Sequence, residues 1–234
     1  MIIIDKLTVQ FGGVRPLDGL SAELGAPVVG LIGPNGAGKT TLLNVLSGFV
    51  TPVTGSVRLD GLELLSLGPR QRVRAGLRRM FQQEMIVHDL SAADNVMAIA
   101  DHVSIAARAS GEAEAAMDFV GLRAARDVPG RRLTLYERRM TEIARTLVGG
   151  PKVILLDEPA AGLNDAETAR LRKVVAAIPE RYGAQVVLID HDADLIASVC
   201  DETMVLDFGK RLAIGPTAKV LEDPVVRRAY LGKA

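Results

Sequence analysis

The chain has 234 residues, of which 48% are hydrophobic and 24% charged, so it can bury a sizeable core as one domain or two closely joined lobes. Its 28 basic and 28 acidic residues cancel, which excludes the surplus positive field that holds nucleic acid by bulk electrostatics. The single cysteine fits a reducing compartment, and we expect neither a cleaved leader nor a membrane span, because no apolar run approaches the roughly 18 residues that a membrane helix needs.

Short strands and a glycine-rich loop are predicted near the start of the chain. Residues 2–11 and 55–64 alternate loosely between apolar and polar side chains, the second run around the turn signal Asp60-Gly61. We expect them to form a small antiparallel β layer. Between them, the apolar run 28–32 ends in a glycine-rich turn and is followed by a helical pattern over 39–47.

The middle of the chain changes in composition. From about residue 84 to 148 the sequence is rich in Ala, Arg and Glu and poor in β-branched runs, which predicts a helical insertion. Apolar runs then return at 153–156, 185–189 and 203–206, with helical patterns between the first two and after the second. This alternation predicts a parallel sheet flanked by helices.

We therefore expect an α/β protein with one domain over residues 1–234. Its core lobe is predicted at about 1–83 and 149–234, and its helical subdomain at about 84–148.

Residues 33–40 match the phosphate-binding pattern Gly-x-x-x-x-Gly-Lys-[Ser/Thr], between a predicted strand and a predicted helix. Backbone N–H groups of such a loop surround phosphate oxygens, helped by the positive end of the helix dipole. Lys39 would reach the β and γ phosphates, and Thr40 would offer its hydroxyl to Mg²⁺. The alternative is a purely structural glycine turn. The candidate ATP-binding residues of this segment are Gly33, Pro34, Asn35, Gly36, Ala37, Gly38, Lys39, Thr40 and Thr41.

Two carboxylates end the apolar run 153–156. Asp157 would hold Mg²⁺ through a water molecule, and Glu158 would act as the general base that polarises the attacking water. A solvated strand end before Pro159 is the alternative interpretation. Open parallel sheets bind ligands at the carboxyl ends of their strands, which favours a site.

These motifs, in this order, resemble the ATPase subunits of ABC transporters over essentially the whole chain. The resemblance implies a P-loop NTPase fold with a RecA-like parallel-sheet core, an N-terminal antiparallel β layer and an inserted α-helical subdomain. It also implies ATP and Mg²⁺ as cofactors and hydrolysis of ATP to ADP and phosphate.

Three further residues match positions of that family. Gln82, in the run Arg79-Met80-Phe81-Gln82, resembles the glutamine that contacts Mg²⁺ and the attacking water, with Gln83 as the other candidate. His191 resembles the histidine that contacts the γ phosphate. Phe11 resembles the aromatic residue that stacks on adenine, although a strand-end core aromatic would look the same in sequence. The resemblance gives Glu158, His191, Lys39 and Gln82 catalytic roles, and Thr40, Gln82 and Asp157 roles at the metal.

The chain departs from the family pattern at residues 133–137. The family's Leu-Ser-Gly-Gly-Gln loop, which reaches the partner subunit's nucleotide, is replaced by Leu-Thr-Leu-Tyr-Glu. Thr134 keeps a hydroxyl, but Leu135 and Tyr136 add bulk and disfavour positive φ. Asn164 stands where most members carry aspartate, and it too would face the partner's nucleotide. Either the loop is a tolerated variant, or the chain pairs with a different ATPase in an asymmetric dimer.

The segments 11–13, 160–164 and 229–232 are similar to ATPase subunits of branched-chain amino-acid importers. That likeness implies membrane permease subunits, a second ATPase subunit, indirectly a periplasmic binding protein, and a peripheral place at the cytoplasmic face of the inner membrane. An ATPase for lipopolysaccharide extraction and one for urea or amide uptake are the alternatives. We expect no nucleic-acid partner, because such family members normally carry a second cassette or a long coiled coil. A non-hydrolysing nucleotide sensor would not need the complete catalytic set.

Overall fold

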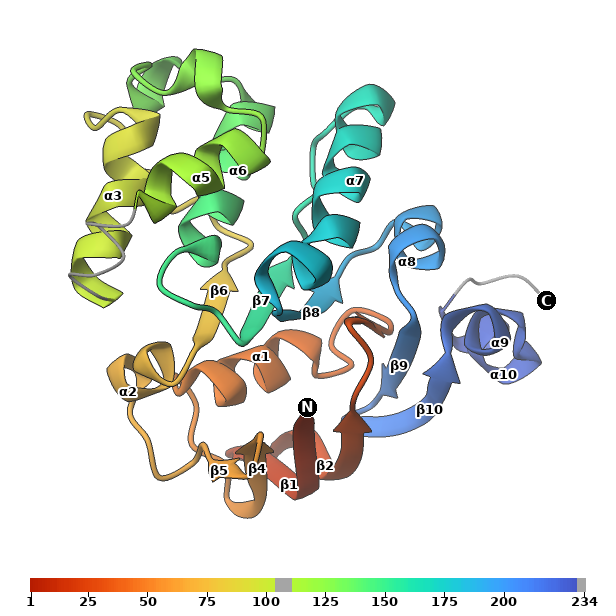
Figure 1. Cartoon of the computed structure of the whole chain (residues 1–234). Helices are drawn as coiled ribbons and strands as arrows, with labels where there is room; N and C mark the ends of the chain where they lie inside the picture. The colour runs from red at the N-terminus through yellow and green to blue at the C-terminus, as the bar shows by residue number, and fades with distance from the viewer. Residues whose placement is uncertain (104–110, 231–234) are drawn as a thin grey trace.

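The computed structural model describes residues 1–103 and 111–230, and in these ranges the predicted α/β architecture is confirmed. Figure 1 shows a small sheet below a larger one, with a group of helices above the larger sheet's edge. Residues 231 and 232, part of the similarity at the end of the chain, lie outside the described ranges.

The smaller sheet is the predicted antiparallel layer, with strand order β2-β1-β4-β5. It pairs Ile2 with Leu24 and Phe11 with Val14 along the first hairpin. The long second strand was not anticipated, since no strand was expected between residues 11 and 28. The strands are β1 (Ile2–Phe11), β2 (Val14–Leu24), β4 (Thr54–Leu59) and β5 (Leu62–Glu63).

The larger sheet has strand order β10-β9-β3-β8-β7-β6, parallel throughout except where β10 pairs with β9. The strands are β3 (Val28–Ile32), β6 (Leu77–Met80), β7 (Val153–Asp157), β8 (Gln185–Ile189), β9 (Glu202–Asp207) and β10 (Lys210–Pro216). Every residue of β3 and β7 is buried, which explains why these strands are continuous apolar runs in the sequence. Strands β6 and β10 were missed, because two arginines interrupt the first and Lys, Arg, Gly and Pro the second.

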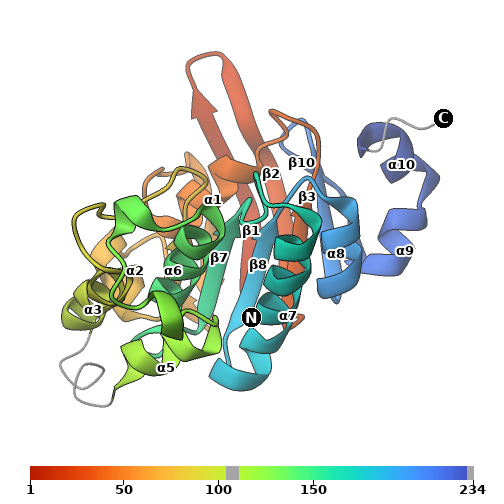
Figure 2. The ribbon, with the colours of Figure 1, turned by 90° about the horizontal axis from the view of Figure 1, so that it is seen from above.

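Alternate residues of β7 enter two separate cores. Ile154 and Leu156 pack in the same cluster as Leu171 of α7, whereas Val153 and Leu155 pack with α1 and the small sheet. The sheet is thus covered on both faces (Figure 2). The helices are α1 (Lys39–Ser47), α2 (Pro69–Arg74), α3 (Ala92–Val103), α5 (Glu112–Phe119), α6 (Leu135–Leu147), α7 (Asp165–Tyr182), α8 (Ala193–Val199), α9 (Thr217–Glu222) and α10 (Pro224–Tyr230), with short 3-10 turns at Arg123–Ala125 and Gly130–Arg132.

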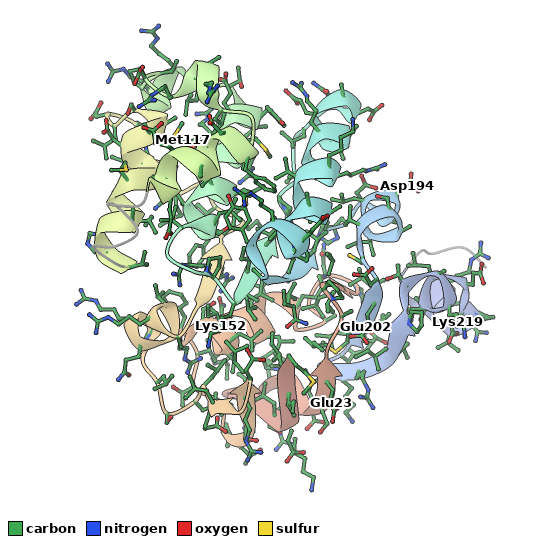
Figure 3. All side chains as sticks on the ribbon, in the orientation of Figure 1. Glu23, Met117, Lys152, Asp194, Glu202 and Lys219 are labelled. Carbon is green, nitrogen blue, oxygen red and sulfur yellow. The ribbon has the colours of Figure 1, made fainter. Side chains whose placement is uncertain are left out.

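The middle of the chain forms a compact helical group of α3, α5 and α6. Met117 lies inside this group and is 4% exposed (Figure 3). Its core is continuous with the face of the large sheet that α7 covers. We therefore propose that residues 84–148 form an insertion in a single domain, and that the insertion shares its hydrophobic core with the large sheet. Among the described helices, none is long and apolar enough to cross a membrane.

Candidate functional site

The loop over residues 33–38 runs from the end of β3 to the start of α1, as the motif predicted. Two of its glycines are required by close backbone approach. A Cβ on Gly33 would lie 2.1 Å from the carbonyl oxygen of Leu206, and one on Gly38 would lie 2.3 Å from that of Pro16. Gly38 also has φ +105°, which only glycine adopts without strain. The loop is therefore held tightly between β9 and β2.

The start of α1 is open. Gly38 is its N-cap, no side chain caps the first turn, and no acidic residue lies in that turn. The backbone N–H groups there are the donors that bind anions at helix N-termini. Thr40 is exposed beside them and Thr41 is half-buried.

Lys39 is buried and folds back over the loop. Its Nζ donates to the carbonyl oxygens of Gly33 at 2.6 Å and Pro34 at 3.0 Å. Burial lowers the pKa of Lys39, and the charges of Glu158 and Asp157 oppose this shift. The ammonium group is thus in place beside the loop, with donors that a phosphate oxygen could accept instead.

Glu158 lies just past the end of β7 and collects two of the predicted residues. Its Oε1 lies 3.0 Å from Nε2 of His191, after β8, and its Oε2 accepts a hydrogen bond of 2.8 Å from Nε2 of Gln82, after β6. Its backbone has φ +53°, a left-handed conformation that costs a non-glycine residue on the order of 1 kcal/mol. Strands β6, β7 and β8 are neighbours, so the sheet order itself brings these side chains together.

Asp157 is 1% exposed and has two oxygens in different situations. Its Oδ2 accepts a hydrogen bond of 2.8 Å from Arg79, while its Oδ1 is buried with no hydrogen-bond partner among the described residues. Burial raises the pKa of Asp157, and the hydrogen bond and charge of Arg79 oppose that shift.

These residues fit a magnesium ion. The buried Asp157 Oδ1 lacks a partner, and the Thr40 hydroxyl and the Gln82 amide supply further oxygens, the ligand type that Mg²⁺ prefers. In the described part of the chain, no three His, Cys, Asp or Glu residues form a metal-binding group. The oxygens of Asp157, Thr40 and Gln82 suit an ion that is held largely by water and phosphate.

Arg79 is the residue of this site that sequence reasoning missed. Its guanidinium is buried and joins Asp157 to Asn44 and Ser47 of α1. The run Arg79-Met80-Phe81-Gln82 drew attention only to its glutamine. Strand β6 was not predicted, so nothing in the sequence indicated that Arg79 is buried and therefore needs a partner.

The structure bears on two alternatives from the sequence: Phe11 as a core aromatic, and Gln83 in place of Gln82. Phe11 is 54% exposed at the tip of the β1–β2 hairpin, so the interpretation as a core aromatic is wrong. Gln83 is exposed, and among the described contacts only Gln82 of the pair bonds to Glu158. His88 and His102 are exposed.

The segment 133–137 folds as an ordinary helix start. Thr134 is the N-cap of α6: its hydroxyl accepts from the Glu137 N–H at 3.2 Å, and Glu137 Oε2 accepts from the N–H of Thr134 at 2.8 Å and from its hydroxyl at 2.9 Å. Leu135 and Tyr136 belong to the first helical turn, and neither has positive φ. The argument that Leu135 and Tyr136 are unsuited because they disfavour positive φ is therefore wrong, since neither position has positive φ. The remaining difference from the two glycines of the family's loop is the bulk of these side chains.

That bulk packs against the chain's own α7 region. The Tyr136 ring lies under the guanidinium of Arg170 at 4.6 Å, and the Leu135 side chain lies within 3.0 Å of where a Cβ on Gly162 would be. Asn164 is the N-cap of α7, accepting from the Glu167 N–H at 3.0 Å. Within the described residues, no hydrogen bond joins Thr134, Tyr136 or Asn164 to the phosphate loop.

Comparison with known proteins gives relatives over the whole chain. Residues 18–161 match the protein family described as "ABC transporter". The chain is 35% identical to the high-affinity branched-chain amino acid transport ATP-binding protein BraF of Pseudomonas aeruginosa, a match that covers 99% of this chain and 97% of that protein. It is 36% identical to the lipopolysaccharide export system ATP-binding protein LptB of Acidithiobacillus ferridurans, over 88% and 85% of the two chains. A crystal structure of the ADP conformation of an ATP-binding cassette of an ABC transporter superposes with a TM-score of 0.88 at 25% identity, covering 100% of this chain and 99% of that one.

Proposed function

Because the chain belongs to the ATP-binding subunits of ABC transporters, we propose that ATP hydrolysis at its phosphate loop powers the uptake of branched-chain or related amino acids. The observation that carries the catalytic part is the pair of contacts on Glu158, from His191 and Gln82. The full-length similarity to BraF supports the solute class.

The residues divide the work of hydrolysis. The N–H groups of the loop and Lys39 bind the phosphates, and Glu158 accepts the proton of the attacking water. His191 and Gln82 hold the Glu158 carboxylate in place. Magnesium, held through Thr40, Asp157 and Gln82, would supply charge neutralisation of the β and γ oxygens. Phe11, exposed beside the loop's supporting strand, is our adenine-stacking residue.

A membrane permease is the proposed partner at an apolar groove between α1, β6 and the helical group. Phe49 and Met85 line this groove and are 59% and 52% exposed, and Phe81 packs edge-on against Phe49 at 5.8 Å between ring centroids. Exposed apolar surface of this kind marks an interface. Phe81 lines the groove and directly precedes Gln82, so an occupant would contact the segment that leads to a proposed catalytic residue. We therefore propose a peripheral position at the cytoplasmic face of the inner membrane.

We further propose a second, different ATPase chain as the dimer partner. Thr134 and Glu137 satisfy each other at the start of α6, and Glu137 adds a negative charge where the partner's γ phosphate would approach. The alternative, that segment 133–137 is a tolerated variant of the family's loop, is supported by the packing of Tyr136 against Arg170. A purified homodimer that hydrolyses ATP at ordinary rates would remove the reason for the asymmetric pair.

Lipid extraction is the second candidate, favoured by the similarity to LptB. Affinity purification of the chain from detergent-solubilised native membranes, followed by mass spectrometry, separates the candidates. Recovery with two permeases and a second ATPase, and loss of leucine uptake on deletion of the gene, are expected. Recovery with lipid-export components would favour lipid extraction instead. Leucine uptake that stays intact after deletion of the gene would contradict the proposal.

A further inference from the structure

Arg79 stands at the junction of three parts of the site. From β6 it donates to Asp157 Oδ2 on β7 at 2.8 Å and to Asn44 Oδ1 on α1 at 2.7 Å, and it lies 3.4 Å from the Ser47 hydroxyl. Its side chain is 5% exposed, and that of Asp157 is 2% exposed. The guanidinium fork is well suited to such a junction, because its donors have fixed directions.

The ring of Phe81 closes the remaining side. The Arg79 guanidinium lies 4.6 Å from the Phe81 ring centroid, and both residues line the apolar groove. The arginine is therefore fixed by hydrogen bonds at its tip and by an aromatic face alongside.

The consequence concerns Asp157. With Oδ2 committed to Arg79, the carboxylate cannot rotate freely, and only Oδ1 remains for a water-mediated contact to a metal. Groups that hold a metal-binding side chain in one orientation change metal affinity without touching the ion.

We propose that Arg79 is a positioning residue for magnesium–nucleotide binding, which fixes Asp157 from the wall of the apolar groove. The inference rests on the proposed nucleotide site.

The test measures metal binding apart from turnover. Mn²⁺ binding to the full chain is followed by electron paramagnetic resonance with saturating non-hydrolysable ATP analogue, and binding of a fluorescent ATP analogue is measured separately in EDTA. Arg79→Met should weaken Mn²⁺ binding about tenfold or more, with nucleotide binding in EDTA changed less than about twofold. Arg79→Lys should recover part of the loss, since it keeps one charged donor.

Arg78→Met is the matched control. Arg78 is the adjacent buried arginine of the same strand, but it donates to the carbonyl oxygens of Val148 and Gly149. Its loss should lower thermal stability and leave Mn²⁺ affinity unchanged. Asn44→Ala, which removes one anchor of Arg79, guards against an unfolded Arg79 variant and should weaken Mn²⁺ binding about twofold to threefold.

Unchanged Mn²⁺ affinity in folded Arg79→Met, or in Asn44→Ala where Arg79→Met does not fold, overturns the inference. An equal loss in Arg78→Met also overturns it, because the effect would then follow from a destabilised strand. A wild-type chain that binds no nucleotide even in EDTA would overturn the proposed nucleotide site itself, a different failure from either of these.

Discussion

Helices α1 and α6 both begin at segments that we propose approach a phosphate, yet their first turns are built in opposite ways. The first turn of α1 follows glycine, has no side-chain cap and carries no acidic residue. The first turn of α6 follows Thr134, whose hydroxyl is bonded to Glu137 in a closed capping box. The start of α1 leaves its N–H donors for an external anion, whereas at the start of α6 the N–H groups of Thr134 and Glu137 are bonded within the capping box. A helix start can thus keep its fold while losing the openness that anion binding needs.

The largest effect is expected at Glu158, beside the phosphate loop that precedes the open start of α1. Glu158→Gln should reduce ATP turnover about 10²- to 10⁴-fold, because the amide cannot accept the proton of the attacking water. Steady-state phosphate release measures the loss, and filter binding of labelled ATP should show that the nucleotide still binds. Turnover at the wild-type rate would contradict the assignment of Glu158 as the base.

Removing the bulk of Leu135 and Tyr136 at the start of α6 should have the next largest effect. The double variant Leu135→Gly/Tyr136→Gly should raise ATP hydrolysis by the homodimer about tenfold, because one regained hydrogen bond to a charged phosphate contributes about 1.5–3 kcal/mol. The matched control Tyr136→Phe keeps the ring and should leave the rate unchanged. A double variant that remains folded but no faster would favour the tolerated-variant interpretation.

Removing the cap of α6 should affect stability more than chemistry. Thr134→Ala should lower the free energy of unfolding by about 1 kcal/mol and Tm by about 2–4 °C, since the Glu137 N–H loses its acceptor. Calorimetry measures the shift, with Thr134→Ser as control.

Cys200 offers an independent reporter of folding, because burial raises the pKa of its thiol to about 12 and it should resist alkylation until the chain unfolds.

The smallest effect is expected from replacing the N-cap of α7 by aspartate. Asn164→Asp should change the free energy of unfolding by less than about 0.5 kcal/mol, because aspartate caps helices as well as asparagine does. Asn164→Ala should cost about 1 kcal/mol in the same urea titration. If the two variants are equally stable, the Asn164 cap contributes nothing and α7 differs from α6 in this respect.

The sequence predicted the parts of the site that are local in the chain. Residues 33–40 and Asp157-Glu158 could be found because each motif is a short contiguous segment whose strand is continuously apolar. The junction at Arg79 could not be found, since its partners Asn44 and Asp157 come from distant segments that only the sheet order brings together. The closed cap of α6 was missed for a different reason: residues 133–137 were compared with a loop motif rather than with the capping pattern Thr-x-x-Glu that they also satisfy.

The position of β3 in the large sheet governs when the site can exist during synthesis. Its two neighbours are β8 and β9, which come from the last quarter of the chain, whereas β1, β2 and β4 pair among themselves early. Contacts between distant segments form slowly because a long loop must first close. A nascent chain therefore carries the complete phosphate-binding motif long before it carries the strands that hold it. Nucleotide can begin to stabilise the fold only after strands β8 and β9 have been synthesised.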